Sequence, residues 1–307
     1  MLDVGLCITV KDEESNIVDC LAPLKDLVAE ILVIDTGSTD ATRELLRDVL
    51  GIEAIRLELD ESECFALSTV RNYGFDRLST PWLMTLDADE RIDPEEVRAV
   101  FSLGDADLPA GMFCRWDTYY DDGTSVEDYK LSLFRSHHRH IGLIHDTAQP
   151  SLRKAGEAAC WLPQMSLRHR PESVRTSKEQ WYDWRLQCAR RREPDWLRYQ
   201  WFSGYMAFRY GQREDAEELL GQVHDARPEL FPVESLNASM VLAGLKARQG
   251  DRVAAERILD QAVTYHDSVA DDFEVRINFR LRPWLDRALE LAASGQLNEI
   301  TPYQFPY

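Results

Sequence analysis

The sequence lacks features that would place the protein in several well-defined classes. Six cysteines are present but no CxxC pair, which argues against a zinc cluster or a disulfide framework and predicts reduced thiols. These residues are Cys7, Cys20, Cys64, Cys114, Cys160 and Cys188. No apolar run approaches the ~18 residues that cross a membrane, and the first residues carry no basic stretch of the kind that opens a signal peptide. We therefore expect a cytoplasmic protein with no integral membrane segment.

Basic residues are few as well. The chain has 35 lysines and arginines against 54 aspartates and glutamates, and its formal net charge is −19 at pH 7. Because nucleic-acid and anionic-membrane binders need arrays of basic side chains, this balance argues against both partners. A hydrophobic content of 44% with 29% charged residues is typical of a folded globular protein. A small anionic ligand, held locally by a metal ion and one or two arginines, is compatible with this composition.

The N-terminal half contains a regular alternation of strand and helix signals. Short apolar runs predict buried strands at 4–10, 30–37, 52–59 and 82–86. Apolar residues at helical spacing predict helices at 14–27, 39–50 and 65–78, and Asp93-Pro94 begins a further helix. This alternation predicts a doubly wound, mostly parallel α/β sheet with ligands at the carboxyl ends of its strands. Two later runs of alternating polarity predict strands at 112–120 and 129–135.

The C-terminal third is predicted to be helical and to repeat. Residues of tetratricopeptide type recur after 39 positions, in Gly204, Gly211, Ala216 and Leu220 and again in Ala243, Gly250, Ala255 and Leu259. The usual period is ~34 residues, so we expect a longer connection between two hairpins, followed by a closing helix at 284–293. The alternative is an unrelated helical bundle with small residues at its crossings. The tail TPYQFPY is expected to be disordered or to dock on a neighbour.

Polar clusters stand where the predicted strands end. They are VKDEE (10–14), DTGSTD (35–40), RN (71–72), DADE (87–90) and HD (145–146). In the run PWLMTLDADE, Asp87, Asp89 and Glu90 fall within four positions, where like charges repel one another and lose hydration. A bound cation would relieve this repulsion, and a solvated turn between strand and helix is the alternative.

Taken together, the segments CITVKDEESNI, ILVIDTGSTDAT, RNYGFDRLSTPWLMTLDADERIDPEE, SLFR and IHD resemble the family-2 inverting glycosyltransferases of the GT-A fold. The resemblance is dense over residues 4–100, thin over 129–170, and extends in outline to a branch with C-terminal tetratricopeptide-like helices. It implies a Rossmann-like GT-A domain at 1–170, a connecting helix at 171–195, an all-α tetratricopeptide-like domain at 196–296 and a tail at 297–307. Asp12 departs from the family, which more often has Asn at this position.

The resemblance implies a metal-dependent, inverting transfer of a sugar from a nucleotide-diphosphate sugar, most commonly a UDP-sugar. Asp89 would hold Mn²⁺ or Mg²⁺, with His169 or His145 as a further ligand, and carboxylate oxygens suit these ions. Residues implied to contact the donor nucleotide are Thr9, Val10, Glu13, Asp35, Arg71, Asp87 and Ala88. The alternatives are a carboxylate partner for Arg71, a turn or helix cap for Asp35, and a structural hydrogen bond for each histidine.

An inverting transfer also needs a general base to deprotonate the acceptor. The resemblance favours Asp146 in IHD, and Asp128 in VEDY is the alternative. His137, His138 and His140 follow the second late strand in a basic loop, which we interpret as a solvated hairpin rather than a metal cluster.

The motifs leave the acceptor open. It would be a glycan, a peptide or a protein, and the repeat-like helices would be suited to present it because such arrays form concave binding surfaces. One alternative function is a catalytically silent scaffold in which the helices do the recognition. Another is a sugar nucleotidyltransferase, although VKDEE is acidic where those enzymes usually carry a glycine-rich, basic loop.

Overall fold

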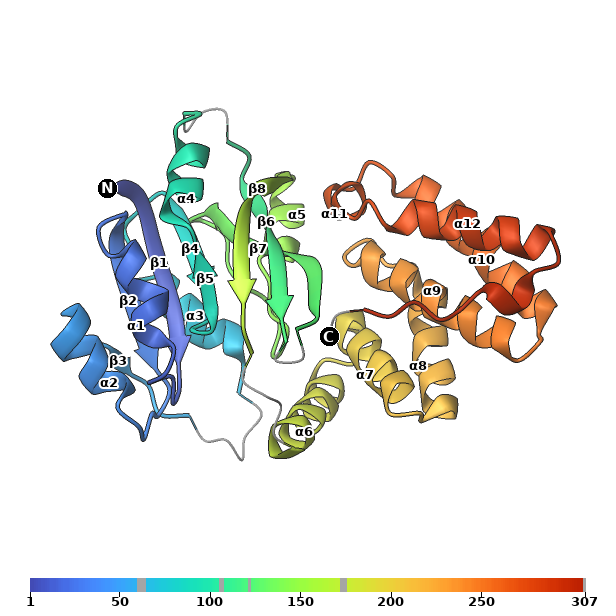
Figure 1. The fold of residues 1–307 in the computed structure, drawn as a ribbon, viewed down its shortest axis with the longest axis horizontal. Coiled ribbons are helices and arrows are strands. Elements are labelled where there is room, and N and C mark those ends of the chain that lie inside the picture. The colour runs from blue at the N-terminus through green and yellow to red at the C-terminus, as the bar shows by residue number, and fades with distance from the viewer. Residues whose placement is uncertain (60–64, 105–107, 121–122, 172–175, 306–307) are drawn as a thin grey trace. The chain divides into compact units, whose positions relative to one another are not determined.

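The computed structural model describes residues 1–59, 65–104, 108–120, 123–171 and 176–305 of the 307-residue chain. These residues form two compact units, 1–178 and 179–305, coloured from blue to yellow-green and from yellow to red in Figure 1. The boundaries predicted at 170, 195 and 296 stay predictions. Five cysteines are described and all are free, whereas Cys64 lies outside the described residues. No helix in the described ranges combines the length and apolar character needed to span a membrane.

The first unit contains an eight-stranded sheet within its described residues. Its strands are β1 (Leu2–Val10), β2 (Val28–Asp35), β3 (Ile55–Arg56), β4 (Trp82–Leu86), β5 (Glu90–Ile92), β6 (Gly111–Tyr119), β7 (Ser125–Arg135) and β8 (Ala159–His169). Their order is β3-β2-β1-β4-β7-β6-β8-β5. The pairs β3/β2, β2/β1, β1/β4 and β6/β8 are parallel, and β4/β7, β7/β6 and β5/β8 are antiparallel. The predicted mostly parallel sheet is confirmed.

Helices cover both faces of this sheet. They are α1 (Ile17–Leu21), α2 (Thr42–Leu45), α3 (Leu67–Phe75), α4 (Pro94–Phe101) and α5 (Gln149–Ala155). Alternate residues of β1 point to opposite faces, so Leu6 joins the core that includes residues of α1 and α4, whereas Cys7 faces Gly74 in α3. A Cβ at Gly74 would clash with the Cys7 sulfur, so glycine permits this close packing. The Asp93 side chain caps α4, as predicted, by accepting a hydrogen bond from the Glu95 N–H at 2.9 Å.

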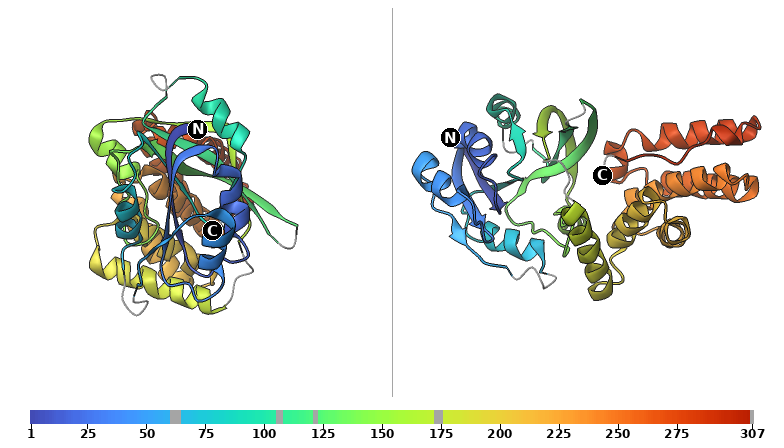
Figure 2. Two further views of the ribbon diagram at one scale, coloured as in Figure 1. Left: turned by 90° about the vertical axis from the view of Figure 1, so that its left-hand side faces the viewer. Right: turned by 60° about the horizontal axis from the view of Figure 1, so that its bottom comes forward.

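The second unit is helical. Its elements are α6 (Thr176–Arg192, of which 176–178 belong to the first unit), α7 (Leu197–Arg209), α8 (Arg213–Ala226), α9 (Pro232–Arg248), α10 (Arg252–Ser268), α11 (Phe273–Ile277) and α12 (Leu281–Ala293), with a 3₁₀ turn at Leu297–Glu299. The pairs α7/α8 and α9/α10 lie side by side as hairpins (Figures 1 and 2). Gly211 and Gly250 make the turns between paired helices with φ of 74° and 75°, in the region that favours glycine. The predicted repeat is thereby confirmed, and α12 is the closing helix.

Residues 300–305, called here the C-terminal segment, pack along α7 and α9. The Tyr205 hydroxyl donates to the Phe305 carbonyl at 2.9 Å, and the Phe305 N–H donates to the same hydroxyl at 2.6 Å. The Phe305 ring also contacts Trp201, with ring centres 5.3 Å apart. A Cβ at Gly244 in α9 would clash with the backbone of Pro302. The tail was expected to be disordered or to dock on a neighbour. Its described part is docked, on helices of its own unit.

Candidate functional site

The loops that follow β1 and β2 are joined by side-chain hydrogen bonds. Asp12 Oδ1 accepts from the backbone N–H groups of Thr39 at 2.6 Å and Asp40 at 3.3 Å. The Glu13 N–H donates to the Thr42 hydroxyl at 2.7 Å. Asp12 has φ of 53°, a left-handed conformation that Asp and Asn tolerate better than most residues. The two motifs VKDEE and DTGSTD therefore form one rigid frame at the carboxyl ends of neighbouring strands.

Asp35, at the end of β2, makes the turn interaction that the sequence offered as one alternative, and its contact with a donor nucleotide stays a prediction. Its Oδ1 accepts from the N–H groups of Gly37 and Ser38, at 3.3 and 2.8 Å, which is the turn interaction. Its Oδ2 is buried and receives no hydrogen bond within the described residues, and Arg43 Nε lies 3.5 Å away. The Thr9 hydroxyl, near the end of the adjacent β1, is also buried without a described partner. Buried oxygens in this state cost free energy unless a donor is supplied, and a nucleotide base carries such donors.

Five charged side chains of alternating sign form a chain at the end of β4. Asp146 Oδ1 contacts Arg71 Nη1 at 2.5 Å, and Arg71 Nη2 contacts Asp87 Oδ1 at 3.0 Å. Lys130, from β7, then joins Asp87 Oδ2 and Glu90 Oε1, each at 2.7 Å. Glu90 is fully buried and its Oε2 accepts the Asp87 N–H at 2.9 Å. Of the carboxylates crowded in the sequence, Asp87 and Glu90 are thus bridged by one cation, Lys130.

These contacts shift the pKa values of the three carboxyl groups in this charge chain. Burial works against ionisation of Asp87, but Lys130 and Arg71 outweigh it and hold the pKa of this carboxyl well below its ordinary value. Burial likewise opposes the charge on Asp146, yet Arg71 and the His140 hydrogen bond lower its pKa strongly. Burial raises the pKa of Glu90, and Lys130 offsets this only in part. Asp87 and Asp146 are therefore stable anions at neutral pH.

Asp89 lies beside His169, the last residue of β8. The short β5 begins at Glu90 and pairs with β8 at His169, and the Arg170 N–H donates to the Asp89 carbonyl at 3.1 Å. This backbone pairing brings Asp89 Oδ2 within 3.3 Å of His169 Nε2. The other ring nitrogen of His169 is 3.0 Å from the Thr118 hydroxyl. The imidazole also stacks on Trp116, with ring centres 4.9 Å apart.

The Asp89–His169 pair fits a divalent cation. Adjacent ligands at about 2.1 Å from an octahedral ion lie about 3 Å apart, close to the observed oxygen–nitrogen distance. The Thr118 hydroxyl contacts the ring nitrogen of His169 that does not face Asp89. It thereby orients the imidazole, as a supporting hydrogen bond does at metal sites. Ala88 is buried between the two aspartates, and its carbonyl accepts from Arg91 at 2.7 Å. His145, the other predicted ligand, has a left-handed backbone with φ of 51°, and its role stays a prediction.

The two candidate bases occupy different environments. The Asp146 side chain is 1% exposed, and its oxygens contact Arg71 and His140 Nδ1, the latter at 2.6 Å. Its low pKa and full set of partners disfavour the sequence-based preference for this residue as the base. Asp128 is half-buried in β7 and lies two residues from Lys130, so both side chains point to the same face of the sheet. In the register it is opposite Trp116, the residue that stacks on His169.

One site residue, Lys130, was missed, and one interpretation was wrong. The interpretation of the SHHRH loop as a solvated hairpin fails for His138 and His140, which are 1% and 5% exposed; His137, 57% exposed, fits it. Lys130 was overlooked because an isolated lysine in an alternating strand is indistinguishable from a solvent-facing residue. In the structure Lys130 pairs with Cys114 of β6, which is buried. The alternation of β7 was the one sequence pattern that indicated an inward-facing lysine.

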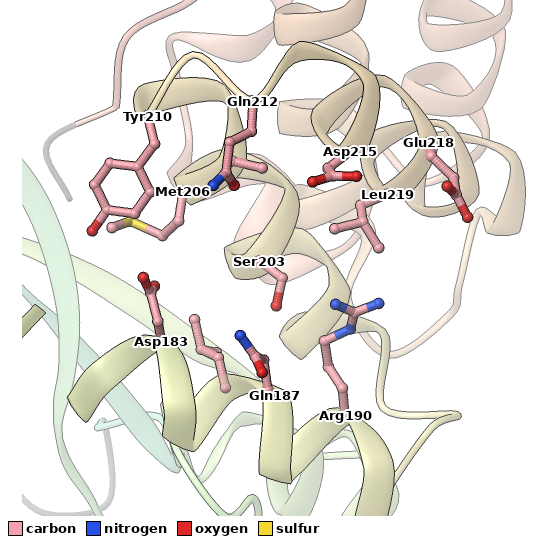
Figure 3. Close-up of a pocket in the computed structure, with 12 residues that line it drawn as sticks. Asp183, Gln187, Arg190, Ser203, Met206, Tyr210, Gln212, Asp215, Glu218 and Leu219 are labelled. Carbon is pink, nitrogen blue, oxygen red and sulfur yellow. The ribbon is translucent and has the colours of Figure 1, made fainter. Parts of the chain in front are cut away.

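A separate cavity of about 340 Å³ lies in the helical unit. Figure 3 shows Asp183, Gln187 and Arg190 from α6 facing Ser203 of α7 and Asp215 of α8. The Ser203 hydroxyl is buried and has no hydrogen-bond partner in the described part of the chain. Acidic groups outnumber the arginine in its lining, so the cavity suits a polar ligand with hydrogen-bond donors.

Comparison with solved structures gives matches at low sequence identity. Residues 1–349 of S. aureus TarS in complex with UDP align over 96% of this chain and 92% of that chain, with 12% identity and a TM-score of 0.46. Glucosyl-3-phosphoglycerate synthase from Mycobacterium tuberculosis, in complex with Mg²⁺ and UDP, aligns over 58% of this chain and 73% of that chain. Its identity is 16% and its TM-score is 0.38.

Curated proteins give matches to parts of the chain. A TPR repeat-containing protein of Synechococcus elongatus is 37% identical over 92 residues, and the lipopolysaccharide core biosynthesis glycosyltransferase LpsC of Rhizobium meliloti is 30% identical over 93 residues. Each match covers 30% of this chain, and the matches span 22% and 33% of those relatives. Residues 6–159, half of the chain, match the model of glycosyl transferase family 2. The chain therefore belongs to glycosyl transferase family 2, the family that its motifs resemble.

Proposed function

We propose that the protein transfers a sugar, with inversion, from a nucleotide-diphosphate sugar to an acceptor nucleophile on a glycan, peptide or protein. The donor is a UDP-sugar and the reaction depends on Mn²⁺ or Mg²⁺. The observation that carries the proposal is the Asp89–His169 pair beside the charge chain at the end of β4. Family membership supports the reaction class.

The charges of the site support binding of a cation together with a diphosphate. Within the described residues, Asp87, Glu90 and Asp146 share two cationic side chains, Arg71 and Lys130, and Asp89 pairs with His169. A divalent cation would balance the excess of carboxylates. Asp89 and His169 would hold it, and when bound it would supply positive charge to the oxygens of the leaving diphosphate. Arg71, 17% exposed, is near enough to the surface to add a charge-assisted hydrogen bond to a phosphate.

The nucleoside half of the donor would bind between the ends of β1 and β2. Asp35 Oδ2 would accept an N–H of the base, because it has no described donor in the chain itself. The backbone of Thr9 and Val10, with Glu13, would flank the base and ribose. Asp87 and Ala88 would lie against the ribose side. The hydrogen bonds between the two loops would hold this frame in place before the donor arrives.

Asp128 is the base that the geometry supports, in place of Asp146. It would accept the proton of the acceptor nucleophile as that atom attacks the anomeric carbon, opposite the diphosphate, which leaves with the bonding electron pair. Asp146 would instead position Arg71, because its oxygens are already shared between Arg71 and His140.

For the acceptor, we propose that the cavity in the helical unit binds a polar group. Its support is the Ser203 hydroxyl, which is buried without a hydrogen-bond partner among the described residues, together with Asp183 and Asp215. Once labelled sugar transfer to glycan and peptide panels identifies an acceptor, Asp215→Asn should raise the KM for that acceptor and leave UDP binding unchanged. An unchanged KM would remove the cavity from the acceptor site.

Titration calorimetry with UDP, GDP, CDP and dTDP, each with and without Mn²⁺, tests the donor half. UDP should bind, more tightly with Mn²⁺, and Asp89→Asn should lose the metal-dependent part. Asp93→Asn is the matched control: it lies in the same acidic segment but only caps α4, so its UDP binding should equal that of the wild type. Failure of every nucleotide to bind the folded protein would favour the silent scaffold. Consumption of UTP with a sugar phosphate would favour the nucleotidyltransferase.

Hydrolysis of the UDP-sugar by water tests the base without a known acceptor. Asp128→Asn should bind UDP normally and release it from UDP-sugar far more slowly. Asp146→Asn should weaken UDP binding, because Arg71 loses one of its two partners. The opposite pattern, normal UDP binding but no hydrolysis in Asp146→Asn alone, would restore Asp146 as the base.

A further inference from the structure

Three potential metal ligands meet outside the proposed donor site. His137 and His138 lie in the turn after β7, and Glu157 follows the end of α5. Glu157 Oε2 is 3.1 Å from His137 Nε2 and 2.8 Å from His138 Nε2. Within the described residues this is the one group of three such side chains whose ligand atoms all lie within 4.8 Å of one another.

The donor set suits a transition metal such as zinc. Zn²⁺ binds histidine nitrogen and carboxylate oxygen at about 2.0–2.2 Å in a tetrahedral arrangement, so two ligands of one ion lie about 3.3 Å apart. The observed nitrogen–oxygen separations are within a few tenths of an ångström of that value. Two imidazoles and one carboxylate favour zinc over Mg²⁺, which prefers an all-oxygen shell. Three protein ligands leave a fourth position for water.

The surroundings hold one ligand in place and leave the others accessible. His138 is 1% exposed, and its Nδ1 lies 3.2 Å from the Ser151 hydroxyl in α5, the supporting contact that orients metal-bound histidines. That hydroxyl also accepts the Arg139 N–H at 3.3 Å. His137 and Glu157 are 57% and 37% exposed, so an ion can enter from solvent with small side-chain movements.

We propose that His137, His138 and Glu157 form a second metal site, for Zn²⁺ or a similar transition ion, which ties together the two ends of segment 137–157. This segment carries Asp146, which contacts Arg71 in the charge chain, and His140, which contacts Asp146. Closing its ends reduces the conformations open to the intervening chain. The ion would thereby stabilise the position of Asp146 while contacting none of the donor-site residues.

Zinc titration of the full chain, after removal of metals with a chelator, tests the site. Because zinc also has affinity for the Asp89–His169 pair, the titration is made in the wild type and in Asp89→Asn. The wild type and Asp89→Asn should each bind one zinc ion tightly, and millimolar Mg²⁺ should not displace it. His137→Gln and Glu157→Gln should lose that ion, and Co²⁺ should give the absorption of a tetrahedral site only where it is kept. Circular dichroism checks the fold of each variant, and both replaced side chains are exposed.

His266→Gln is the matched control for adventitious binding. His266 Nδ1 lies 3.5 Å from Asp267 Oδ1 but belongs to no described three-ligand group, so zinc stoichiometry should be unchanged. Amide hydrogen exchange is the structural readout: zinc should slow exchange over residues 139–148 in the wild type and not in His137→Gln. Equal zinc binding by wild type, His137→Gln and Glu157→Gln would overturn the site. Binding with unchanged exchange over 139–148 would overturn its tying role.

Discussion

Replacement of Lys130 by methionine is the most direct test of the charge chain. Lys130 is 21% exposed and contacts Asp87 and Glu90. Methionine keeps most of the side-chain volume and removes the charge. Glu90, 0% exposed, would then keep one hydrogen bond, from the Asp87 N–H, and lose its only described cation.

The magnitude follows from the exposure of each partner. Removing one member of a buried ion pair costs about 3–5 kcal/mol, because the other charge stays buried without compensation. Asp87 is 43% exposed and retains Arg71, so water replaces part of what it loses. Glu90 is not reached by water and keeps no described cation. We therefore expect Lys130→Met to lower the free energy of unfolding by about 3 kcal/mol at pH 7.5, the lower end of that range. Protonation of Glu90 removes the unpaired charge, so the deficit should shrink as pH falls towards 5, by at most about 1.4 kcal/mol per pH unit.

Amide hydrogen exchange of peptides from β4 and β7 measures the loss of stability around Lys130. It reports on the first unit independently of the helical unit. The double variant Lys130→Met/Glu90→Gln should recover most of the loss, because the glutamine is neutral. Lys154→Met, at an exposed lysine of α5, is the control and should change stability by less than about 0.5 kcal/mol. A loss below about 1 kcal/mol, or no recovery in the double variant, would show that water screens Glu90 and would refute the reasoning.

Three further predictions concern packing and pH. Gly74→Ala should destabilise the first unit by about 1–3 kcal/mol in a urea titration, because the new Cβ clashes with Cys7. Gly221 lies on α8 with open space around it, so the control Gly221→Ala should stabilise the helical unit by about 0.5–1 kcal/mol in the same titration. Gly244→Ala should displace the C-terminal segment and expose it to protease, and unchanged cleavage would contradict the packing described. Burial lowers the pKa of His224 despite its bond to Gln261, so the unfolded chain takes up the proton first. Helical-unit stability should therefore be full above pH ~6.5 and fall below it, by at most about 1.4 kcal/mol per unit, and His224→Gln should flatten the profile measured by hydrogen exchange.

Local patterns predicted much of the fold. The run WLMTL predicted β4 to the residue, because a strand buried on both faces is almost entirely apolar and this run ends abruptly at Asp87. Repeated small residues at Gly204 and Ala243 predicted the hairpins, because helix crossings admit only small side chains there. By contrast β8 was missed, since Pro163 interrupts its apolar pattern at an irregularity in the pairing with β6.

The site could be predicted only where its residues are close in sequence. The DADE and DTGSTD motifs each lie within one turn, so their chemistry is visible without a structure. The contact between Arg71 and Asp146 joins residues 75 positions apart, and no periodicity reports such a distance. For the same reason the sequence could not show that the Asp146 oxygens are already engaged, which is what disfavours it as the base.

The frame made by Asp12 bears on how related sequences can diverge. One carboxylate oxygen serves donors of the next loop, including the Thr39 and Asp40 N–H groups, from a left-handed backbone position. Asparagine preserves both the acceptor and the tolerance for that conformation, whereas valine or alanine would lose both. Position 12 is thus constrained by the backbone of the loop that follows β2, and a change in the fold of either loop has to be matched by a change in the other.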